Sequence, residues 1–206
     1  MTSRHESEAR FLDSALRLIR SKGYAATSVD ELCAAAGLTK GSFFHHFKSK
    51  EDLAIAATEH FSTMADGMFA SASYRAIEDP LERLLGYVDL RASLLHGDLP
   101  DYTCLLGTMV QETYETHPAI REACEKALSS HSADVAKDVA AAKRHYAPRA
   151  QWTAESVAHF IQATIQGAFV LAKAKQGPDI AVECLAHLRR YLKLLFPIKP
   201  LASKGK

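Results

Sequence analysis

Few residues of this 206-residue chain are spaced for catalysis or for metal binding. The ten histidines and four cysteines are scattered, with no His-Glu-x-x-His run and no Cys-x-x-Cys pair, and the adjacent His45 and His46 point to different sides of a helix. No nucleophile with a neighbouring base and no phosphate-cradling glycine loop stands out. We therefore expect neither an enzyme nor a metal or organic cofactor.

The residues best suited to binding chemistry lie between Thr39 and His46. Thr39 is placed to cap a helix from which Lys40, Ser42 and His46 are predicted to face outward. A helix N-terminus with free backbone N–H groups and a lysine in its first turn suits contacts with phosphates and base edges. Residues 1–50 hold eight Lys and Arg against five Asp and Glu, which favours a polyanion partner, although a solvated basic face explains the same charges.

Two short helices joined by a glycine turn would position these residues. Apolar residues spaced three and four apart predict a first helix over 8–21, which Gly23 ends. Ser28 can cap a second helix, with Glu31 reaching back to it, and Gly37 can end that helix in the left-handed conformation. In such a helix-turn-helix, the helix after the turn enters the DNA major groove. The side chains predicted to fill the joint are Cys33, Leu38 and Phe43.

The rest of the chain is predicted to be helical, because no segment alternates with the period of a strand. Pro80, Pro118 and Gly177-Pro178 mark breaks between helices, and Pro100 and Pro148 are placed in loops. The expected helices lie near 50–72, 80–96, 104–116, 118–146, 153–176 and 179–196. This predicts an all-α protein of about nine helices, with a DNA-binding helix-turn-helix domain at 1–48, a ligand-binding and dimerisation bundle at 49–197 and a flexible tail at 198–206.

The composition also bears on location. No hydrophobic stretch reaches the roughly 18 consecutive apolar residues of a membrane-spanning helix. The four cysteines are far apart and no signal peptide precedes them, so we expect neither a disulfide framework nor a zinc ribbon. A cytoplasmic protein with no membrane partner is expected.

The N-terminal run resembles the TetR family of transcription regulators. That family opens with an amphipathic helix and continues with Gly-Tyr, Thr-Ser or Thr-Thr, a short helix, Ala-Gly-Val, Ser/Thr-x-Gly-x-x-Tyr-x-His-Phe and Ser-Lys-Glu-x-Leu. The matching residues here are Gly23-Tyr24, Thr27-Ser28, Leu32-Cys33, Ala36-Gly37-Leu38, Thr39 to Phe47 and Ser49 to Leu53. Phe44 stands where the family usually has tyrosine, so that hydroxyl contact with a phosphate is lost.

The resemblance implies that a homodimer binds a palindromic operator in double-stranded DNA and is released from it by a small molecule, as a repressor. An activator and a ligand-independent architectural DNA-binding protein remain alternatives. The residues that the resemblance places near bases or sugars are Lys40, Ser42, Phe43 and Phe44. Those placed on phosphates are Thr27, Thr39, His46 and Lys50, and Ser28 and Gly41 belong to the same DNA-binding segment.

Candidate ligand contacts lie in the larger domain, since helical bundles hold pockets between facing helices. Methionine adapts to varied shapes, and polar residues within apolar stretches need partners. The predicted contacts are Met64, Met68, Tyr87, Arg91, Cys104, Met109, Glu112, His131, Phe160, Thr164 and Phe169. For each of the apolar ones core packing is the more common role, and a buried pair or an exposed face is the alternative for Glu112 and His131. Cys104 opens a helix whose dipole favours a thiolate, so it is either a packed thiol or an oxidant sensor.

The last two expected helices carry apolar stripes wider than one partner covers. Ala163 and Gly167 allow close helix approach, and Leu188 lies on the stripe of the final helix. We expect a two-fold dimer seam on these helices, which an aspartate at Leu188 would split or unfold.

Overall fold

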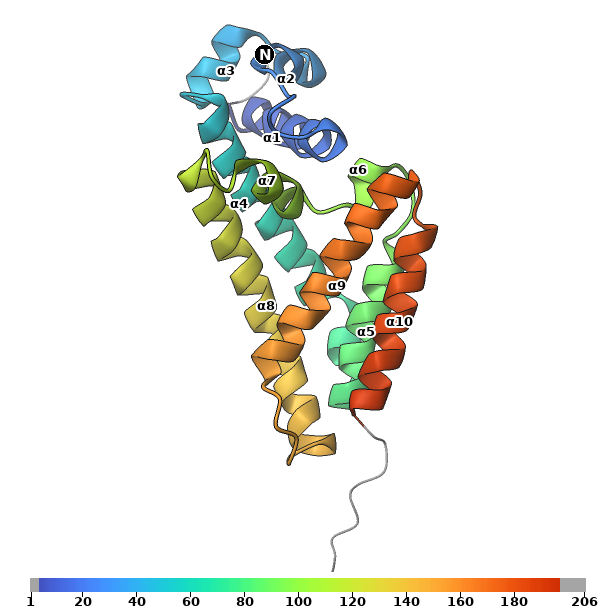
Figure 1. Cartoon of the computed structure of the whole chain (residues 1–206). Helices are drawn as coiled ribbons and strands as arrows, with labels where there is room; N and C mark the ends of the chain where they lie inside the picture. The colour runs from blue at the N-terminus through green and yellow to red at the C-terminus, as the bar shows by residue number, and fades with distance from the viewer. Residues whose placement is uncertain (1–3, 197–206) are drawn as a thin grey trace, which may run out of the picture. The chain divides into compact units, whose positions relative to one another are not determined.

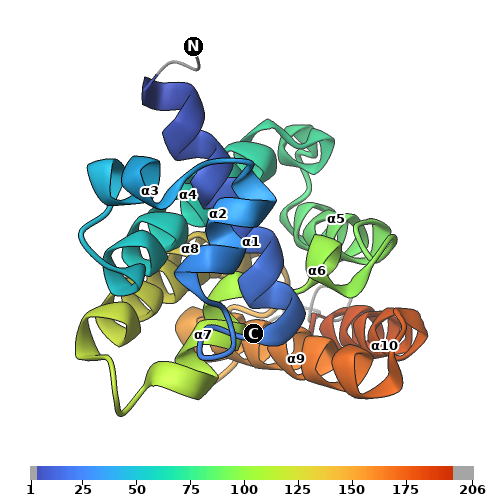
Figure 2. The ribbon, with the colours of Figure 1, turned by 90° about the horizontal axis from the view of Figure 1, so that it is seen from above.

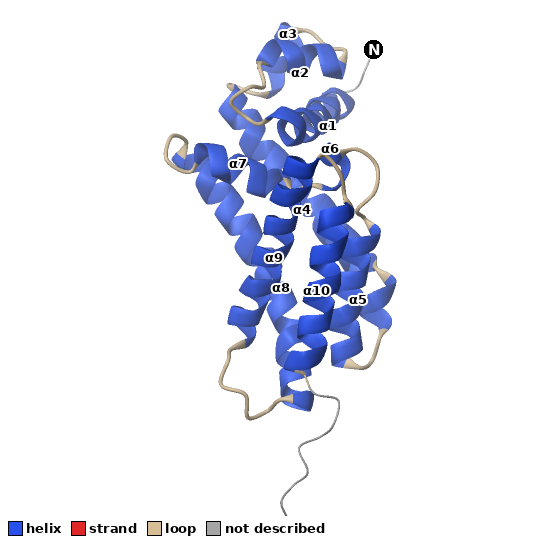
Figure 3. Cartoon of the chain, turned by 45° about the vertical axis from the view of Figure 1, so that its right-hand side comes forward, coloured by secondary structure: helices blue, strands red, loops and turns tan. Residues whose placement is uncertain are grey.

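The structure is a computed structural model that describes residues 4–196 (Figure 1). These residues form ten α-helices and one short 3-10 helix, and no strand occurs among them (Figure 3). The all-α prediction is confirmed, whereas the predicted tail at 198–206 lies outside the described residues. The helices are α1 Arg4–Lys22, α2 Val29–Ala36, α3 Lys40–His46, α4 Lys50–Ser71, η1 Ser73–Ala76, α5 Pro80–Ser93, α6 Leu99–Tyr102, α7 Leu105–Thr113, α8 Pro118–Tyr146, α9 Ala154–Lys175 and α10 Asp179–Leu195.

The chain packs into two compact units. Among the described residues, unit 1 contains those up to Phe69 together with Asp98–Ser129, and unit 2 contains Ala70–Gly97 and those from Ser130 to Phe196. Helices α4 and α8 therefore contribute residues to both units. The functional boundary predicted after residue 48 stays a prediction.

One hydrophobic core runs through unit 1. Phe11 of α1 and Phe43 of α3 are fully buried and meet edge to face, with ring centroids 5.5 Å apart. Met109 of α7 and Ile120 of α8 are fully buried in the same core. Helices α1 to α3 thus share their core with helices that come much later in the sequence.

Prolines begin several helices, because a helix's first turn makes no use of their missing N–H. Pro80 and Pro118 are the first residues of α5 and α8, at the predicted breaks. The prediction that Pro100 lies in a loop was wrong, since Pro100 is the second residue of α6. The first turn tolerates proline there. This single-turn helix raises the number of α-helices in the described residues to ten.

Unit 2 is built on α5, α9 and α10. Helix α10 packs against both α9 and α5 through buried apolar side chains. An ion pair between Arg189 of α10 and Asp89 of α5, with Nε and Oδ1 2.7 Å apart, adds a polar link. Ile161 and Ile165 of α9 and Leu188 of α10 are almost fully buried. Much of the predicted apolar stripe is therefore used within one chain.

Candidate DNA-binding surface and ligand-binding residues

The segment from α2 to α3 has the predicted helix-turn-helix geometry (Figure 2). The Ser28 hydroxyl accepts the backbone N–H of Glu31 at 3.2 Å, and the Glu31 carboxylate accepts the backbone N–H of Ser28 at 2.9 Å. Gly37 ends α2 with φ 62° and ψ 38°, the left-handed conformation that favours glycine. Thr39 caps α3 by accepting the N–H of Ser42 at 3.2 Å. The predicted caps and turn are confirmed.

A second contact fixes α2 against α1. The Glu31 carboxylate binds the Lys22 ammonium as well as Ser28. These hydrogen bonds, that of Lys22 foremost, lower the pKa of Glu31 to about 2. The carboxylate therefore stays ionised at neutral pH and holds the start of α2 near the end of α1.

Helix α3 exposes a mixed basic and aromatic surface. Lys40, Gly41, Phe44 and His45 are exposed, and Phe44 is 58% accessible although it is aromatic. The Lys40 ammonium lies 2.7 Å from the Asp30 carboxylate, and this contact raises the pKa of Lys40.

His45 belongs to this surface although it was not among the predicted contacts. Its ring lies edge-on to that of His46, with centroids 5.2 Å apart. The sequence holds a signal for it: Phe43 and Phe47 are one helical turn apart and point inward, which leaves His45 on the other side of the helix, facing solvent.

Several predicted DNA contacts have side chains that are already used within unit 1. Thr27 is 1% exposed and donates its hydroxyl proton to the Gly23 carbonyl at 2.7 Å, and Phe43 is fully buried. His46 is half-buried, with its Nε2 2.7 Å from the Ser7 hydroxyl of α1. Whether these three residues contact DNA stays a prediction.

Lys50, also predicted to touch a phosphate, holds the loop between α1 and α2. Its ammonium donates to the carbonyls of Tyr24 at 3.1 Å and Thr27 at 3.0 Å. The same ammonium lies 4.2 Å from the centroid of the Tyr24 ring, a cation–π contact. Burial lowers the pKa of Lys50, and the negative charge of Glu112 opposes that shift. This role could not be predicted from local spacing, because the two partners precede Lys50 by 26 and 23 residues.

The predicted ligand contacts of unit 1 do not share one environment. Met109 is fully buried in the core, while Met64 is 53% and Met68 36% exposed. Cys104 is half-buried at the start of α7. Glu112 accepts the backbone N–H of Ala25, so its carboxylate serves the loop between α1 and α2.

In unit 2 the structure brings together two pairs of predicted ligand contacts. The Tyr87 hydroxyl is 2.9 Å from Nε2 of His131. The Arg91 guanidinium lies over the Phe169 ring, 5.5 Å from its centroid. Phe160 instead is 45% exposed and stacks beside Tyr191 of α10, and Thr164 donates its hydroxyl proton to the Phe160 carbonyl at 2.9 Å.

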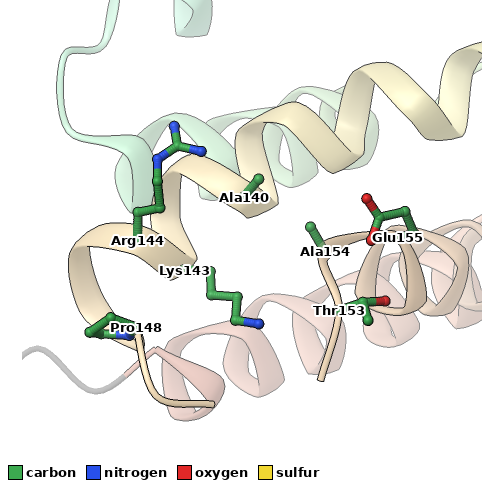
Figure 4. Close-up of a pocket in the computed structure, with 7 residues that line it drawn as sticks. All are labelled: Ala140, Lys143, Arg144, Pro148, Thr153, Ala154 and Glu155. Atoms are coloured by element: carbon green, nitrogen blue, oxygen red, sulfur yellow. The ribbon is translucent and has the colours of Figure 1, made fainter. Parts of the chain in front are cut away.

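A surface recess of about 620 Å³ lies in unit 2 where α8 ends and α9 begins (Figure 4). None of its lining residues was a predicted ligand contact. The Lys143 ammonium donates to the Trp152 carbonyl at 2.6 Å, and the Thr153 hydroxyl caps α9 by accepting the N–H of Ser156. Since these groups serve the connection between the two helices, we assign no ligand to the recess. Its lining residues are Ala140, Lys143, Arg144, Pro148, Thr153, Ala154 and Glu155.

The described residues contain no group of three or more His, Cys, Asp or Glu side chains arranged to hold a metal ion. None of their helices is both long enough and apolar enough to cross a membrane.

Comparison with known proteins identifies both parts of the chain. Residues 11–57 match the model of the bacterial regulatory proteins of the tetR family, and residues 80–180 match the model of the C-terminal domain of LmrA/YxaF-like transcriptional regulators. The HTH-type transcriptional regulator YxaF of Bacillus subtilis strain 168 is 28% identical over 138 residues, which cover 66% of this chain and 72% of YxaF. YerO of the same organism is 39% identical over 61 residues, but these cover only 30% of this chain and 21% of YerO.

The fold agrees with these matches. A TetR transcriptional regulator from Chloroflexus aurantiacus J-10-FL superposes with a TM-score of 0.81 at 25% identity, covering 94% of this chain and 97% of that one. The helix-turn-helix geometry, the two family matches and this structural likeness together show that the chain belongs to the TetR/AcrR family of transcriptional regulators and carries that family's DNA-binding helix-turn-helix.

Proposed function

We propose that the chain is a ligand-responsive repressor, which binds a palindromic operator in the cytoplasm as a homodimer and releases it when a small molecule binds. The observation that carries this proposal is the exposed surface of α3, formed by Lys40, Gly41, Phe44 and His45. The capped turn before α3 holds that surface in one conformation. Preorganisation of this kind lowers the entropy cost of binding.

The chemistry of α3 suits a DNA groove. Lys40 supplies charge for a phosphate, and the exposed Phe44 ring supplies an apolar surface for a sugar or a thymine methyl group. Gly41 adds no side chain, and a Cβ there would have only the Thr39 hydroxyl within 4 Å, at 3.7 Å. The backbone at that point is therefore open to close approach by DNA.

The homodimer is supported by an exposed apolar face on α9 and α10. Exposed apolar side chains that gather on adjacent helices commonly mark an interaction surface. The rings of Phe160 and Tyr191 lie with centroids 4.8 Å apart and join the two helices on this face. A Cβ at Gly167 would meet nothing within 4 Å, so α9 is open to a partner helix there. The exposed apolar residues of this face are Phe160, Val170 and Leu171 of α9 and Tyr191 and Leu194 of α10.

Leu188 is not suited to test the seam by itself. Leu188 is 2% exposed and belongs to the core of its own unit. A charge there would unfold unit 2 before it reported on dimerisation. Leu194, which is 82% exposed on the same helix, is the residue to substitute instead.

Release by a ligand requires that the two recognition helices lose their fit to the operator. A two-fold dimer must hold them about 34–36 Å apart to enter successive major grooves. Helices α4 and α8 contribute residues to both compact units, so each can carry a change from unit 2 into unit 1. A coupling of roughly 1–3 kcal/mol reduces operator affinity 5–150-fold.

The test begins with selection of bound sequences from a random DNA pool. A palindromic consensus is expected, and Lys40→Ala should weaken binding to it in fluorescence anisotropy. A reporter gene whose promoter overlaps that consensus should then be silenced, and a screen of small molecules should find one that relieves the silencing. Selection of no consensus would contradict operator binding. Activation of the reporter would contradict repression, and silencing that no compound relieves would favour the architectural alternative.

A further inference from the structure

Unit 2 contains a buried polar cluster centred on Tyr87. Tyr87 is 3% exposed, and its hydroxyl is 2.9 Å from Nε2 of His131 on α8. Arg91 follows Tyr87 by four residues and so lies on the same side of α5, over the Phe169 ring of α9. Tyr74 of η1 completes the group, with its ring centroid 6.1 Å from that of Tyr87. Four separate elements thus place polar and aromatic groups around one point.

The Tyr74 hydroxyl is the unusual member of this cluster. Tyr74 is 4% exposed, and its hydroxyl has no hydrogen-bond partner in the structure. Buried polar groups nearly always have such a partner, and one without it points to a missing ligand or water. The position is fixed by close packing, because a Cβ at Gly86 of α5 would lie 2.7 Å from the Tyr74 Cβ. The hydroxyl therefore cannot easily turn toward solvent.

The surroundings of the cluster favour an anion over a cation. Asp138 is the carboxylate that binds Arg75 and Arg83, with N to O distances of 2.8 and 2.9 Å. Its one negative charge is therefore outnumbered by these two arginines, and Arg91 adds a third positive charge.

Asp134 does not reverse this balance, because its carboxylate pairs with Lys137 at 2.6 Å. Burial lowers the pKa of His131 to about 4, and the charges of Arg91 and Arg75 act in the same direction, so the imidazole is neutral at pH 7. A neutral imidazole accepts a hydrogen bond at one nitrogen and donates at the other. His131 can thus accept the Tyr87 proton and fix that ring.

We propose that Tyr74 and Arg91 recognise the carboxylate of a small organic acid, and that such an acid is the effector. The Tyr74 hydroxyl donates to one carboxylate oxygen, which supplies the partner that it lacks, and the Arg91 guanidinium supplies the positive charge. The Phe169 and Tyr87 rings contact the hydrocarbon part of the acid. This inference rests on the proposed ligand-responsive function, since it names the class of ligand that this function requires.

The experiment measures binding directly by isothermal titration calorimetry on the full chain at pH 7. The probes are acetate, butyrate, hexanoate, benzoate and phenylacetate, each paired with its uncharged primary amide. At least one acid should bind at least tenfold more tightly than its amide. Tyr74→Phe removes only the unpartnered hydroxyl and should reduce the affinity for that acid roughly tenfold. Arg91→Gln should abolish the preference for acid over amide.

A matched control separates recognition from folding. Tyr114→Phe removes a hydroxyl from a tyrosine that is 57% exposed, and it should leave the affinity for the acid unchanged. Tyr74→Phe should melt at the same temperature as the native chain or at a higher one, because it removes a buried polar group that has no partner. Loss of acid binding without loss of stability is the signature of a recognition role.

The proposal is overturned if none of the five acids is preferred over its amide, or if Tyr74→Phe and Arg91→Gln keep the native preference. Operator binding is measured separately by anisotropy in the absence of acid. Acid binding without operator binding would leave the carboxylate site standing, but it would refute the repressor and with it the role of the acid as effector. Operator binding without any preference for an acid over its amide would refute the carboxylate site and leave the repressor standing.

Discussion

The Glu112 carboxylate of α7 accepts the backbone N–H of Ala25 at 2.9 Å, and so joins a helix late in the sequence to the loop that precedes the helix-turn-helix. Gly23 makes room for this contact. It adopts φ 92°, and a Cβ there would lie 2.2 Å from a Glu112 carboxylate oxygen. Any other residue at this position would be strained in conformation and would displace the Glu112 carboxylate.

Gly23→Ala should therefore destabilise the fold by about 1–3 kcal/mol, since it adds backbone strain and displaces Glu112. Urea denaturation followed by circular dichroism measures this. The control is Gly67→Ala on α4, where a Cβ would meet nothing within 4 Å and helix propensity should rise. Equal effects of the two substitutions would contradict the fit between Gly23 and Glu112.

Lys40→Ala should weaken operator binding and reduce the salt dependence of log K by about one, because one phosphate contact is lost. The fold should survive, since Lys40 is exposed. Asp30→Ala gives the opposite test, because it frees Lys40 from its present partner and should not weaken binding. Anisotropy titrations at several salt concentrations distinguish these results. An unchanged salt dependence in Lys40→Ala would contradict the proposed contact between α3 and DNA.

Lys50→Met should lower the free energy of unfolding by about 1–3 kcal/mol, because the carbonyls of Tyr24 and Thr27 lose a charged donor. Lys48→Met, at an exposed neighbour, is the matched control and should change little. If Lys50 instead contacts a phosphate, Lys50→Met should change the salt dependence of DNA binding and leave the free energy of unfolding unchanged. Chemical denaturation and DNA titration of the same variant decide between the two roles.

The free energy of unfolding should decrease as the pH is lowered, because of His131. The unfolded chain takes up a proton near the ordinary pKa of 6.5, whereas the folded chain does so only at about 4, owing first to burial and then to Arg91 and Arg75. Stability is therefore complete above pH 6.5 and is lost between pH 6.5 and 4, by at most about 3 kcal/mol.

His131→Gln should flatten this part of the pH profile, although it also disturbs the bond to Tyr87 at every pH. His159→Gln, at an exposed histidine of α9, is the control and should retain the native slope. Urea denaturation between pH 7.5 and 4 gives the slopes. A native-like slope in His131→Gln would assign the pH dependence to other groups.

The proposed dimer can be tested without damaging the core. Leu194→Asp and Gly167→Arg place charges on the exposed face of α9 and α10, where the single chain has room for them. Both should yield folded monomers, because a buried unpaired charge is too costly in a seam. Leu188→Asp should unfold instead. Sedimentation velocity at micromolar concentration checks all three, and a native chain that sediments as a monomer would refute the seam.

The features predicted correctly from the sequence are formed by residues that are close together in the chain. The Ser28 and Glu31 capping box, the Gly37 turn and the Thr39 cap each depend on residues within four positions of one another, so their spacing alone specifies the geometry. The all-helical fold followed from apolar periodicity for the same reason.

What could not be predicted depends on distant partners. The role of Lys50 follows from two carbonyls in another loop, and that of Glu112 from the N–H of Ala25, which is 87 residues away. Leu188 shows a similar limit. It lies on the apolar stripe of α10, and only the packing against α5 and α9 decides that it is buried within its own unit.

The four cysteines carry free thiols, of which Cys33 and Cys124 are buried while Cys104 in unit 1 and Cys184 in unit 2 are half-buried. The natural sequence thus supplies one reachable attachment point for a thiol-reactive fluorophore or spin label in each unit. Distances between such labels, recorded with and without DNA or ligand, would follow any movement between the units without an engineered residue. Protection of the Cys184 thiol from alkylation on α10 would report dimer formation in the same sample.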